Sequence, residues 1–343
     1  MIMLWDVLKK AVTGRRVKER DFDMELFKTV SQLVKDFDIK YDPENPVSSS
    51  NELADNVWEA ALRFYIKVGT YCINTGRVIN FTEEEIKEAL KEASKEITLG
   101  EGKDAVKLVD RRVGDAVKPI VAAGIQTAIF SSEDMAFKIY KLCAREPATD
   151  GIWGGLESKV AGKYEIKANH PTEIYQYRRN SRVLRKAISA AGRPGMFIMN
   201  NAPTSTATIS MFDRETGLRP TDPMVCGGLS EMKISYDELN RVAFALDYGS
   251  PIVTAHNAVI GGFSGGPSGA AIVAVAGGLQ GLLVQQGKVV RPGTIHNRLK
   301  TRADRSCIWT AALACQAFAR NSHVPTDQGD HPVAGPGTDQ YLY

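Results

Sequence analysis

The stretch PIVTAHNAVIGGFSGGPSGAAIVAVAGGLQGLLVQQG, residues 251–287, places a glycine-rich loop between two apolar segments. PIVTAH (251–256) is short and rich in β-branched residues, which is typical of a buried strand. The segment from Ser268 to Gln286 is rich in Ala, Gly and Leu and is long enough for a helix. The stretch therefore predicts a strand, a glycine loop and a helix, in that order.

The glycine loop has two physical uses that the sequence alone does not separate. Bare backbone allows a small-residue helix to pack closely on a sheet, and it also lets a ligand approach the unpaired N–H groups of a helix N-terminus. The glycines follow the pattern GGxxGGxxG, and there is no GxxxxGK[ST] and no GxGxxG. A ligand at this loop would therefore not be bound through either common phosphate-binding motif.

The alternation of short apolar runs with helical stretches extends through the second part of the chain. Besides 251–256, the predicted strands are KPIVAAG (118–124), MFIMNN (196–201), EMKIS (231–235), LLVQQG (282–287) and HPVAG (331–335). Between them, helices are predicted over 131–145, 175–191 and 301–319. Because strands that alternate with helices indicate a parallel sheet, and no dinucleotide fingerprint is present, we expect a (β/α)8 TIM-type barrel over 116–343.

The first part of the chain, residues 1–115, has a different pattern and is predicted to be a helical extension. A helical stripe runs from Leu53 to Tyr71, and Thr82-Glu83-Glu84-Glu85 is a capping box that begins a further helix. Residues 97–115 alternate around glycine turns, so we expect a hairpin or irregular β segment that covers one end of the fold.

Composition excludes several classes of protein. The net charge is +3, from 43 basic and 40 acidic residues, and no basic tract favours nucleic-acid binding. The longest apolar stretch, from Ala270, falls short of the roughly 20 residues that span a bilayer. The 5 cysteines form no CxxC and no Cys/His cluster, which indicates reduced thiols in the cytoplasm and no metal site.

Polar residues collect where the predicted strands end. In a barrel of this kind the active site lies at the carboxyl ends of the strands, so side chains at those ends are candidates for one shared cavity. The candidates are Asn200, Asn201, His256, Asn257, Gln285, Gln286, Asp330 and His331. Each single histidine has a structural, hydrogen-bonded role as its alternative. The sequence carries no hydrolase signature.

Several stretches, in the same order along the chain, resemble the monomethylamine:corrinoid methyltransferase family of methanogenic archaea. They are GTYCINTGRVINFTEEEI (69–86), LGEGKDAVKLVDRRVGDAVKPIVAAG (99–124), AGRPGM (191–196), LSEMKIS (229–235), IGGFSGG (260–266), RPGTIHNRLKTR (291–302) and VAGPGTDQ (333–340). The resemblance implies a (β/α)8 barrel that passes a methyl group from a methylated amine to the cobalt of a separate corrinoid protein. It implies no tightly bound cofactor, because the cobamide is carried by that partner.

The resemblance also assigns roles to residues. The family's pyrrolysine falls on Met199, or on the adjacent Asn200, and its two flanking acids fall on Val225 and Ala255. A glutamine and a tyrosine of that site fall on Gly329 and His331. We therefore expect catalytic positions at Met199, Asn200, His256 and His331, and substrate contacts at Asn201, Asn257, Gln285, Gln286 and Asp330. Gly261, Gly262, Gly265 and Gly266 are expected at the barrel mouth, facing the corrinoid.

These replacements change the expected methyl donor. Monomethylamine needs help in orientation and leaving, whereas a quaternary ammonium already carries its charge and leaves as a neutral amine. We therefore expect a quaternary or otherwise activated N-methyl donor that is bound by positioning. Trp153, Tyr175, Phe212 and Phe263 are available for a cation cage, with core packing as the alternative role of each.

The family's chain continues beyond the GPGTDQ region, where this sequence ends. The expectation is an incomplete barrel that comes from truncation or is closed by a second chain, with a homo-oligomer as one form, because an open parallel edge is costly. The alternative to a methyltransferase is a degenerate barrel that has lost catalysis and acts as a binding or assembly protein.

Overall fold

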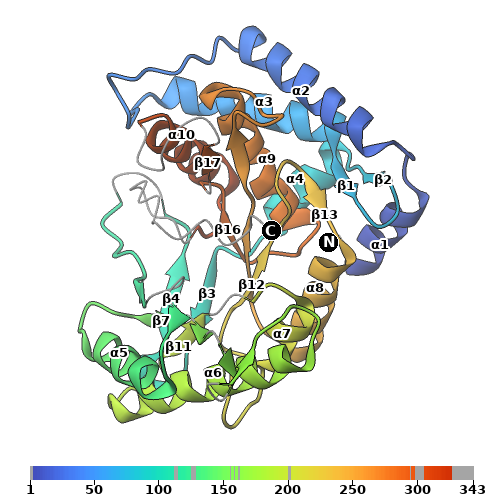
Figure 1. Ribbon diagram of the computed structural model, residues 1–343. Coiled ribbons are helices and arrows are strands. Elements are labelled where there is room, and N and C mark those ends of the chain that lie inside the picture. Colours follow the sequence, from blue (N-terminus) through green and yellow to red (C-terminus); the bar gives the residue numbers. More distant parts are fainter. Residues whose placement is uncertain are drawn as a thin grey trace.

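The structure is a computed structural model that describes residues 3–111, 115–124, 129–154, 156–157, 159–160, 163–199, 202–293, 295–297 and 305–326. The first part of the chain forms the helices that Figure 1 shows in blue and cyan along one side of the molecule: α1 (Leu4–Thr13), α2 (Glu19–Asp36), α3 (Asn51–Val68) and α4 (Glu83–Glu92). Within the described residues, no helix is long and apolar enough to cross a membrane.

Local signals set the bounds of these helices. Ser50 caps α3, because its Oγ accepts a hydrogen bond from the backbone N–H of Leu53 at 3.1 Å. The predicted capping box of α4 is confirmed: the Thr82 Oγ1 accepts from the Glu85 N–H, and the Glu85 carboxylate accepts from the Thr82 N–H at 2.8 Å. The stripe of α3 is buried against later helices, so the extension shares one hydrophobic core with the rest of the fold. The division into domains at residue 115 stays a prediction.

Parallel strands form the centre of the fold, in two three-stranded sheets. One sheet contains β5 (Ala122–Ala123), β7 (Gly151–Trp153) and β11 (Phe197–Met199), and the other contains β12 (Met224–Gly227), β14 (Ile252–Ala255) and β16 (Val289–Arg291). A helix follows each strand, in the order α5 (Glu133–Arg145), α6 (Pro171–Ala190), α7 (Ser205–Ser210), α8 (Tyr236–Tyr248), α9 (Pro267–Leu283) and α10 (Arg305–Ser322). The expected alternating α/β architecture with parallel strands is therefore confirmed.

Smaller β pairs lie outside these two sheets. They are β1 (Thr70–Cys72) with β2 (Arg77–Ile79) and β13 (Lys233–Ile234), β6 (Ile129–Phe130) with β8 (Leu156–Glu157), β9 (Lys159–Val160) with β10 (Tyr164–Glu165), and β15 (Ala258–Ile260) with β17 (Ile295–Asn297). β15 follows β14 in the chain and β17 follows β16, and the two form a further parallel pair beyond the carboxyl ends of those strands.

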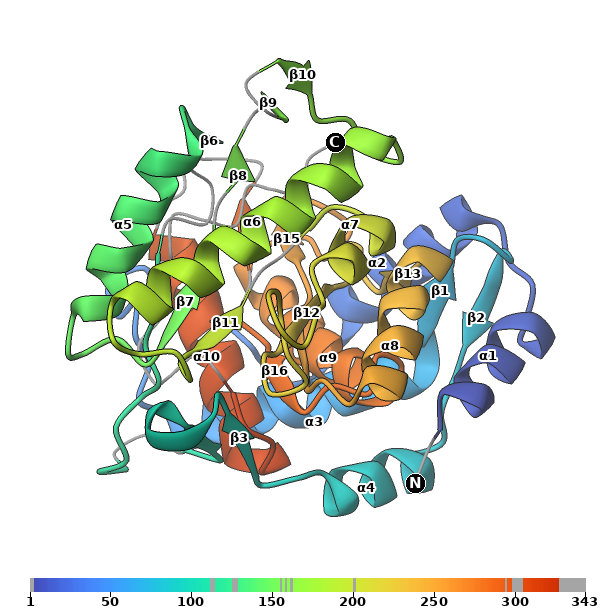
Figure 2. The same ribbon diagram turned by 90° about the horizontal axis from the view of Figure 1, so that it is seen from below.

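The two faces of the central strands belong to different clusters. Alternate residues of the strands pack with the β3–β4 hairpin in what we call the inner cluster: Leu99, Leu108, Phe197, Met199, Val225, Val253 and Val289. The residues between them, such as Ile198, Cys226 and Val290, belong to the outer core beneath the helices. The strands thus face the inner cluster on one side and carry helices on the other, as in Figure 2.

The hairpin, β3 (Glu96–Leu99) and β4 (Val106–Val109) joined by a short 3-10 helix (Gly102–Asp104), covers the amino-terminal end of this interior. The Gly100 N–H donates to the Thr221 carbonyl at 3.1 Å, and the Glu101 N–H donates to the Gly195 carbonyl at 2.8 Å. Gly195 and Thr221 both precede central strands, so the hairpin lies where those strands begin. The expectation of a β segment over one end of the fold is confirmed.

Closure of the strands into a ring is not seen in the part of the chain that the structure describes. β11 and β12 are not hydrogen-bonded to each other there. After α10 the chain returns beside β16, where the Val290 N–H donates to the Pro325 carbonyl at 3.1 Å and Val290 pairs with Thr326 in parallel. Pro325 and Thr326 therefore lie beside β16.

Two of the predicted barrel strands are wrong. Residues 231–235 form β13, which pairs in parallel with β1 rather than with the central sheets, and the central strand of this region is β12, which the pattern missed. Within 282–287, Leu282 and Leu283 end α9, and the strand starts only at Val289. Apolar runs of this length fit a buried helix as well as a strand, which explains the second error. The predicted strand at 331–335 lies outside the described residues.

The helix α9 explains part of the glycine-rich stretch. It is buried on all sides, between β14 and β15 on one side and α3 and α10 on the other (Figure 1). A Cβ at Gly277 would lie 2.6 Å from the His256 Cβ, one at Gly278 would lie 2.4 Å from the Phe318 ring, and one at Gly281 would lie 2.3 Å from the Thr254 Oγ1. These glycines let the helix approach strand and helix neighbours that any side chain would push away.

Candidate functional site

The carboxyl ends of the central strands come together around the interior. Five of the six central strands end in a residue on the face of the inner cluster: Trp153, Met199, Gly227, Ala255 and Arg291. Trp153 packs against that cluster, and each of the other four lies two positions after one of its members. Trp153 is in register with Met199, and Ala255 is in register with both Gly227 and Arg291. We call these five residues the strand-end group. They are the candidate site, because ligands of parallel α/β folds bind at these ends.

A cation and an aromatic ring meet within the strand-end group. The guanidinium of Arg291 lies 4.2 Å from the centre of the Trp153 ring, a cation–π distance, and the two residues come from different sheets. The Trp153 Nε1 is buried and has no hydrogen-bond partner. Arg291 was not among the sequence-predicted site residues. The sequence did contain a signal for Arg291, because a charged residue that directly follows Val289 and Val290 falls on the same face of the strand as Val289.

The positions that replace the family's functional residues form the apolar part of the site. Met199 and Val225 belong to the inner cluster and are nearly fully buried. Ala255 follows on the inward face of β14, two residues after Val253. Met199, Val225 and Ala255 therefore all lie on the inward face of the central strands. Catalytic function at Met199 stays a prediction.

His256 and Gln285 do come close together, but on the opposite face of the strands. A Cβ at Gly228 would lie 2.2 Å from the His256 Nδ1, and His256 also contacts Gly277 and Gly281 of α9, so its ring is enclosed between Gly228 and that helix. Burial lowers the pKa of His256 to about 4, and the Gln285 side chain opposes this only in part. The His256 ring therefore faces α9 and not the inner cluster that contains Met199, because consecutive residues of a strand face opposite sides. The expected convergence of His256 and Gln285 with Asn200, Asn201 and His331 stays a prediction.

Gln285 and Gln286 are also not at a strand's carboxyl end. They follow α9 and precede β16, so they lie before the strand that was expected to end there. The Gln285 Nε2 donates to the Cys226 carbonyl at 3.4 Å, and the Gln286 Nε2 donates to the Leu283 carbonyl at 2.8 Å. Both amides hold the turn between helix and strand, so the strand-end argument for their contact with substrate no longer applies.

Of the remaining candidates, only Asn257 is among the described residues. Asn257 is buried, its carbonyl accepts from the Glu231 N–H at 3.1 Å, and its Oδ1 has no hydrogen-bond partner. Asn200, Asn201, Asp330 and His331, which were expected at the same site, lie outside the described residues, as does Gly329. Their roles stay predictions.

The glycine loop lies beyond β15, on the carboxyl side of the strands, and packs against α2 and Glu231. The Glu231 carboxylate accepts from the Ser264 N–H at 2.8 Å and from its Oγ at 2.7 Å. A Cβ at Gly262 would lie 2.5 Å from that carboxylate, and Gly261 has a φ of 83°. Gly261 and Gly262 therefore have structural reasons to be glycine. A Cβ at Gly266 would meet nothing within 4 Å, and one at Gly265 only a Phe27 ring carbon at 3.9 Å.

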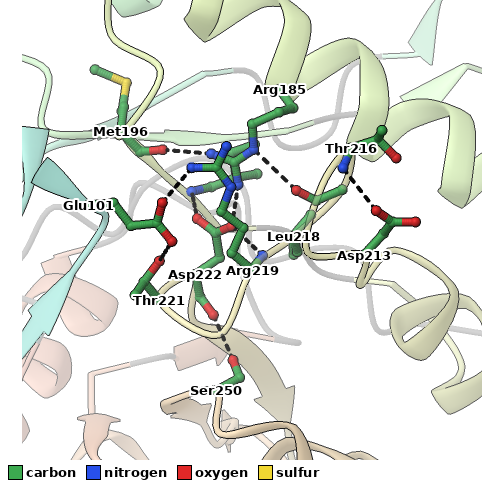
Figure 3. Close-up of polar contacts among 12 residues, drawn as sticks. Glu101, Arg185, Met196, Asp213, Thr216, Leu218, Arg219, Thr221, Asp222 and Ser250 are labelled. Atoms are coloured by element: carbon green, nitrogen blue, oxygen red, sulfur yellow. Dashed lines mark hydrogen bonds and ion pairs between the residues drawn. The ribbon is translucent and has the colours of Figure 1, made fainter.

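A buried ion pair holds the strand that carries Met199, as Figure 3 shows. Arg185 of α6 pairs with Asp222 and donates to the Met196 carbonyl at 3.2 Å and the Gly217 carbonyl at 3.1 Å. The Asp222 carboxylate also accepts from the Ile198 N–H at 2.7 Å. Burial raises the pKa of Asp222 and lowers that of Arg185, against the attraction between them. The pair thus fixes the start of β11 from both sides.

No metal site emerges among the residues whose positions are described, where no three His, Cys, Asp or Glu side chains come together. Of the aromatic residues suggested for a cation cage, Trp153 alone belongs to the strand-end group. Phe212 packs against Phe244 and Tyr248, whereas Tyr175 and Phe263 are exposed.

Comparison with known proteins identifies relatives along nearly the whole chain. The model of a family described as "Monomethylamine methyltransferase MtmB" matches residues 2–343. Monomethylamine methyltransferase MtmB2 of Methanosarcina acetivorans is 28% identical over 340 residues, which cover 98% of this chain and 74% of that protein. Monomethylamine methyltransferase MtmB1 of Methanosarcina barkeri is 27% identical over 340 residues, which again cover 98% of this chain and 74% of that protein.

Solved structures agree with these matches. The crystal structure of the Methanosarcina barkeri monomethylamine methyltransferase (MtmB) superimposes with a TM-score of 0.87 at 25% identity, over 95% of this chain and 71% of that one. The crystal structure of a hydroxylamine MtmB complex gives the same values. The fold and the order of its elements are therefore shared along the matched length.

Proposed function

Because the chain belongs to the monomethylamine methyltransferase MtmB family, and is therefore a methyltransferase, we propose that it moves a methyl group from a methylated amine to the Co(I) of a separate corrinoid protein. The observation that carries this proposal is the position of Met199, Val225 and Ala255 around one interior at the strands' carboxyl ends. We further propose that the two parallel sheets are parts of a (β/α)8 barrel. A cytoplasmic location agrees with the five cysteines, all within the described residues, none of which forms a disulfide.

The proposed reaction is a displacement at the methyl carbon. The C–N bond breaks as the C–Co bond forms, the amine leaves with the electron pair of the broken bond, and Co(I) is oxidised to Co(III). The protein's task is then to hold the donor in line and to keep water away. Strand ends made of Met199, Gly227 and Ala255 suit that task, because they are small or apolar.

Our first prediction is that quaternary N-methyl compounds are better donors than monomethylamine. At Val225 and Ala255 no carboxylate is available to orient a protonated amine, whereas a quaternary nitrogen needs no proton to leave. We expect at least about a tenfold lower rate with monomethylamine, the equivalent of about 1.4 kcal/mol in the barrier. The measurement is formation of methyl-Co(III) from Co(I) corrinoid protein by absorbance, with each donor and with the methyltransferase omitted as the control.

Rapid methylation of the corrinoid protein by monomethylamine would contradict this choice of donor but would still support the proposed methyltransferase activity. A different result would contradict the proposed function as a whole. If no N-methyl compound yields methyl-Co(III) although the corrinoid protein still binds, the binding or assembly role becomes the better description.

Our second prediction concerns the open part of the glycine loop. Gly266 has a φ of −80° and empty space around its Cβ position, so Gly266→Trp is expected to leave the melting temperature within about 2 °C of the parent protein. If Gly265 and Gly266 face the corrinoid protein, the same change raises the KM for that protein several-fold without changing the KM for the donor. Steady-state kinetics with the two substrates varied separately measures both.

Gly262→Ala is the matched control for the loop. Its new methyl group would lie 2.5 Å from the Glu231 carboxylate, so we expect lower thermal stability from this change. An unchanged KM for the corrinoid protein in a folded Gly266→Trp variant would show that the loop serves only packing and turning.

A further inference from the structure

We propose that Arg241 and Asp237 of α8 are positioning residues for methyl transfer, because they hold the segment that follows β11 to the elements that follow β12. We call these two residues the α8 pair. The inference rests on the proposed function, and it adds two residues that neither the sequence-based prediction nor the strand-end group contains. Through the α8 pair, α8 sets the spacing between the two halves of the candidate site.

The candidate site is divided between two sheets. Met199 ends β11 in one sheet, whereas Val225 and Ala255 belong to β12 and β14 of the other sheet. Within the described residues, no backbone hydrogen bond joins β11 to β12. The spacing between the two halves therefore depends on other contacts, and those contacts decide how a donor between the halves is placed.

A side chain joins the two sheets where these strands begin. Asp222 comes shortly before β12, and its carboxylate accepts from the Ile198 N–H of β11 at 2.7 Å. The Asp222 carbonyl also accepts from the Oγ of Ser250, shortly before β14, at 2.6 Å. One aspartate thus connects β11 to both neighbouring strands of the second sheet, as Figure 3 shows in part.

The α8 pair makes the corresponding connection where the strands end. Pro203 and Ser205 follow β11 and lead into α7, whereas α8 follows β12 in the chain. The Arg241 Nη2 donates to the Pro203 carbonyl at 2.7 Å and to the Asp237 carboxylate at 2.8 Å. That carboxylate accepts from the Ser205 N–H at 2.9 Å. These contacts hold α7 beside α8 (Figure 2).

Charge and burial strengthen this connection. Only 3% of the Arg241 side chain is exposed, so little water competes for its N–H groups. Burial raises the pKa of Asp237, but the hydrogen bonds from Ser205 and the charge of Arg241 outweigh this effect, so the pKa lies below its ordinary value. Ser205 is the first residue of α7, where a backbone N–H has no partner within the helix, and Asp237 supplies the acceptor.

Loss of the α8 pair is expected to affect methyl transfer more than folding. β11 would remain paired with β7 and connected to Asp222, so its place in the first sheet is kept. The segment after Met199 would lose its connection to α8, and the two halves of the site would no longer be held at one spacing. A misplacement of about 1 Å can lower a reaction rate about a hundredfold.

The kinetic test compares Arg241→Gln and Asp237→Ala with the parent protein in the methyl-Co(III) assay. The donor is tetramethylammonium or monomethylamine, whichever the parent protein uses faster. We expect kcat to fall at least about tenfold, with the KM for the corrinoid protein changed less than about twofold and the melting temperature by less than about 5 °C. Arg241→Lys keeps the charge and a donor, so it should recover part of kcat, which a purely structural role does not predict.

Arg178→Gln is the matched control for losing an arginine–aspartate pair. Arg178 of α6 lies 3.5 Å from Asp213, which follows α7, so this pair does not involve α8. We expect kcat of this variant to stay within about twofold of the parent value. If Arg241→Gln or Asp237→Ala does not fold, Asp237→Asn, which keeps an acceptor for Ser205 but not the charge, carries the comparison.

Hydrogen–deuterium exchange tests the contact without any methyl transfer. The Ser205 amide donates to Asp237, so a peptide containing Ser205 should exchange at least about tenfold faster at this amide in Asp237→Ala. Peptides from α9 should exchange as in the parent protein. Unchanged exchange at Ser205 in a folded Asp237→Ala variant would overturn the inference.

Failure of this inference differs from failure of the proposed function. If the parent protein is active and kcat is unchanged in folded Arg241→Gln and Asp237→Ala, the proposed function stands and the positioning role is rejected. If the parent protein forms methyl-Co(III) from no N-methyl compound, the proposed function fails, and exchange at Ser205 decides whether the α8 pair holds α7.

Discussion

Replacing Asp222 with Ala is expected to lower the free energy of unfolding by about 3–5 kcal/mol, since it leaves the Arg185 guanidinium buried without its counter-charge. The Arg185 and Asp222 side chains are only 6% and 1% exposed, so water does not replace the lost partner. The change also removes the acceptor of the Ile198 N–H, which holds the start of β11. Denaturant unfolding followed by circular dichroism measures the loss.

Two further variants distinguish the effect of a buried, unpaired charge on stability from the effect of losing an exposed ion pair. Asp222→Asn keeps the shape and an acceptor, so we expect it to cost less than Ala while still removing the charge. Asp134→Ala breaks a surface pair with Lys138, whose side chains are 69% and 67% exposed, and should change stability by less than about 1 kcal/mol. If Asp222→Ala also changes the free energy of unfolding by less than about 1 kcal/mol, the Arg185–Asp222 pair does not stabilise β11.

Lowering the pH from 6.5 to 4 is expected to destabilise the protein through His256 by about 3 kcal/mol. The pKa of this histidine falls from 6.5 in the unfolded chain to about 4 in the fold, so between these values the unfolded chain binds a proton that the folded state does not. The contribution is present above pH 6.5 and is lost as pH falls toward 4. Each unit of difference corresponds to about 1.4 kcal/mol.

Unfolding free energies at a series of pH values, for the parent and for His256→Gln, measure this contribution. The variant keeps a polar group of similar reach but does not titrate, so its stability should fall less steeply between pH 6.5 and 4. His170→Gln, at the exposed cap of α6, is the matched control for replacing a histidine that is not buried. Equal slopes for the parent and His256→Gln would mean that His256 is not buried as a neutral ring.

Part of the candidate site was predictable from sequence. Counting two residues along a strand from a buried valine predicts that Val225 shares a face with Gly227, and that Val253 shares one with Ala255. The same count excludes His256 from that face. The sequence-based prediction included His256 because of its polarity at a strand end and did not apply this count. Whether a strand's last residue points to the interior or to a helix depends on register, which composition does not give.

The glycine loop is a second case in which the sequence predicts the position of a segment but not the role of each residue. Its position between a strand and a helix was predictable, but which glycines serve the backbone and which are open was not. Gly262 is fixed by the carboxylate of Glu231, which comes from a separate loop, whereas Gly266 has no neighbour within 4 Å of its Cβ position. The sequence pattern GGxxGGxxG is the same for both.

The sequence by itself determined the local structure and the family. Capping residues such as Thr82 and Ser235, and the periodicity of buried side chains, act within a few residues of each other, so the caps and most of the helices follow from the chain alone. The tertiary structure alone decided that Arg291 contacts Trp153 and that His256 lies beneath α9. Such contacts join residues far apart in sequence, and they form only after strand register and helix packing have fixed which side chains face the same space.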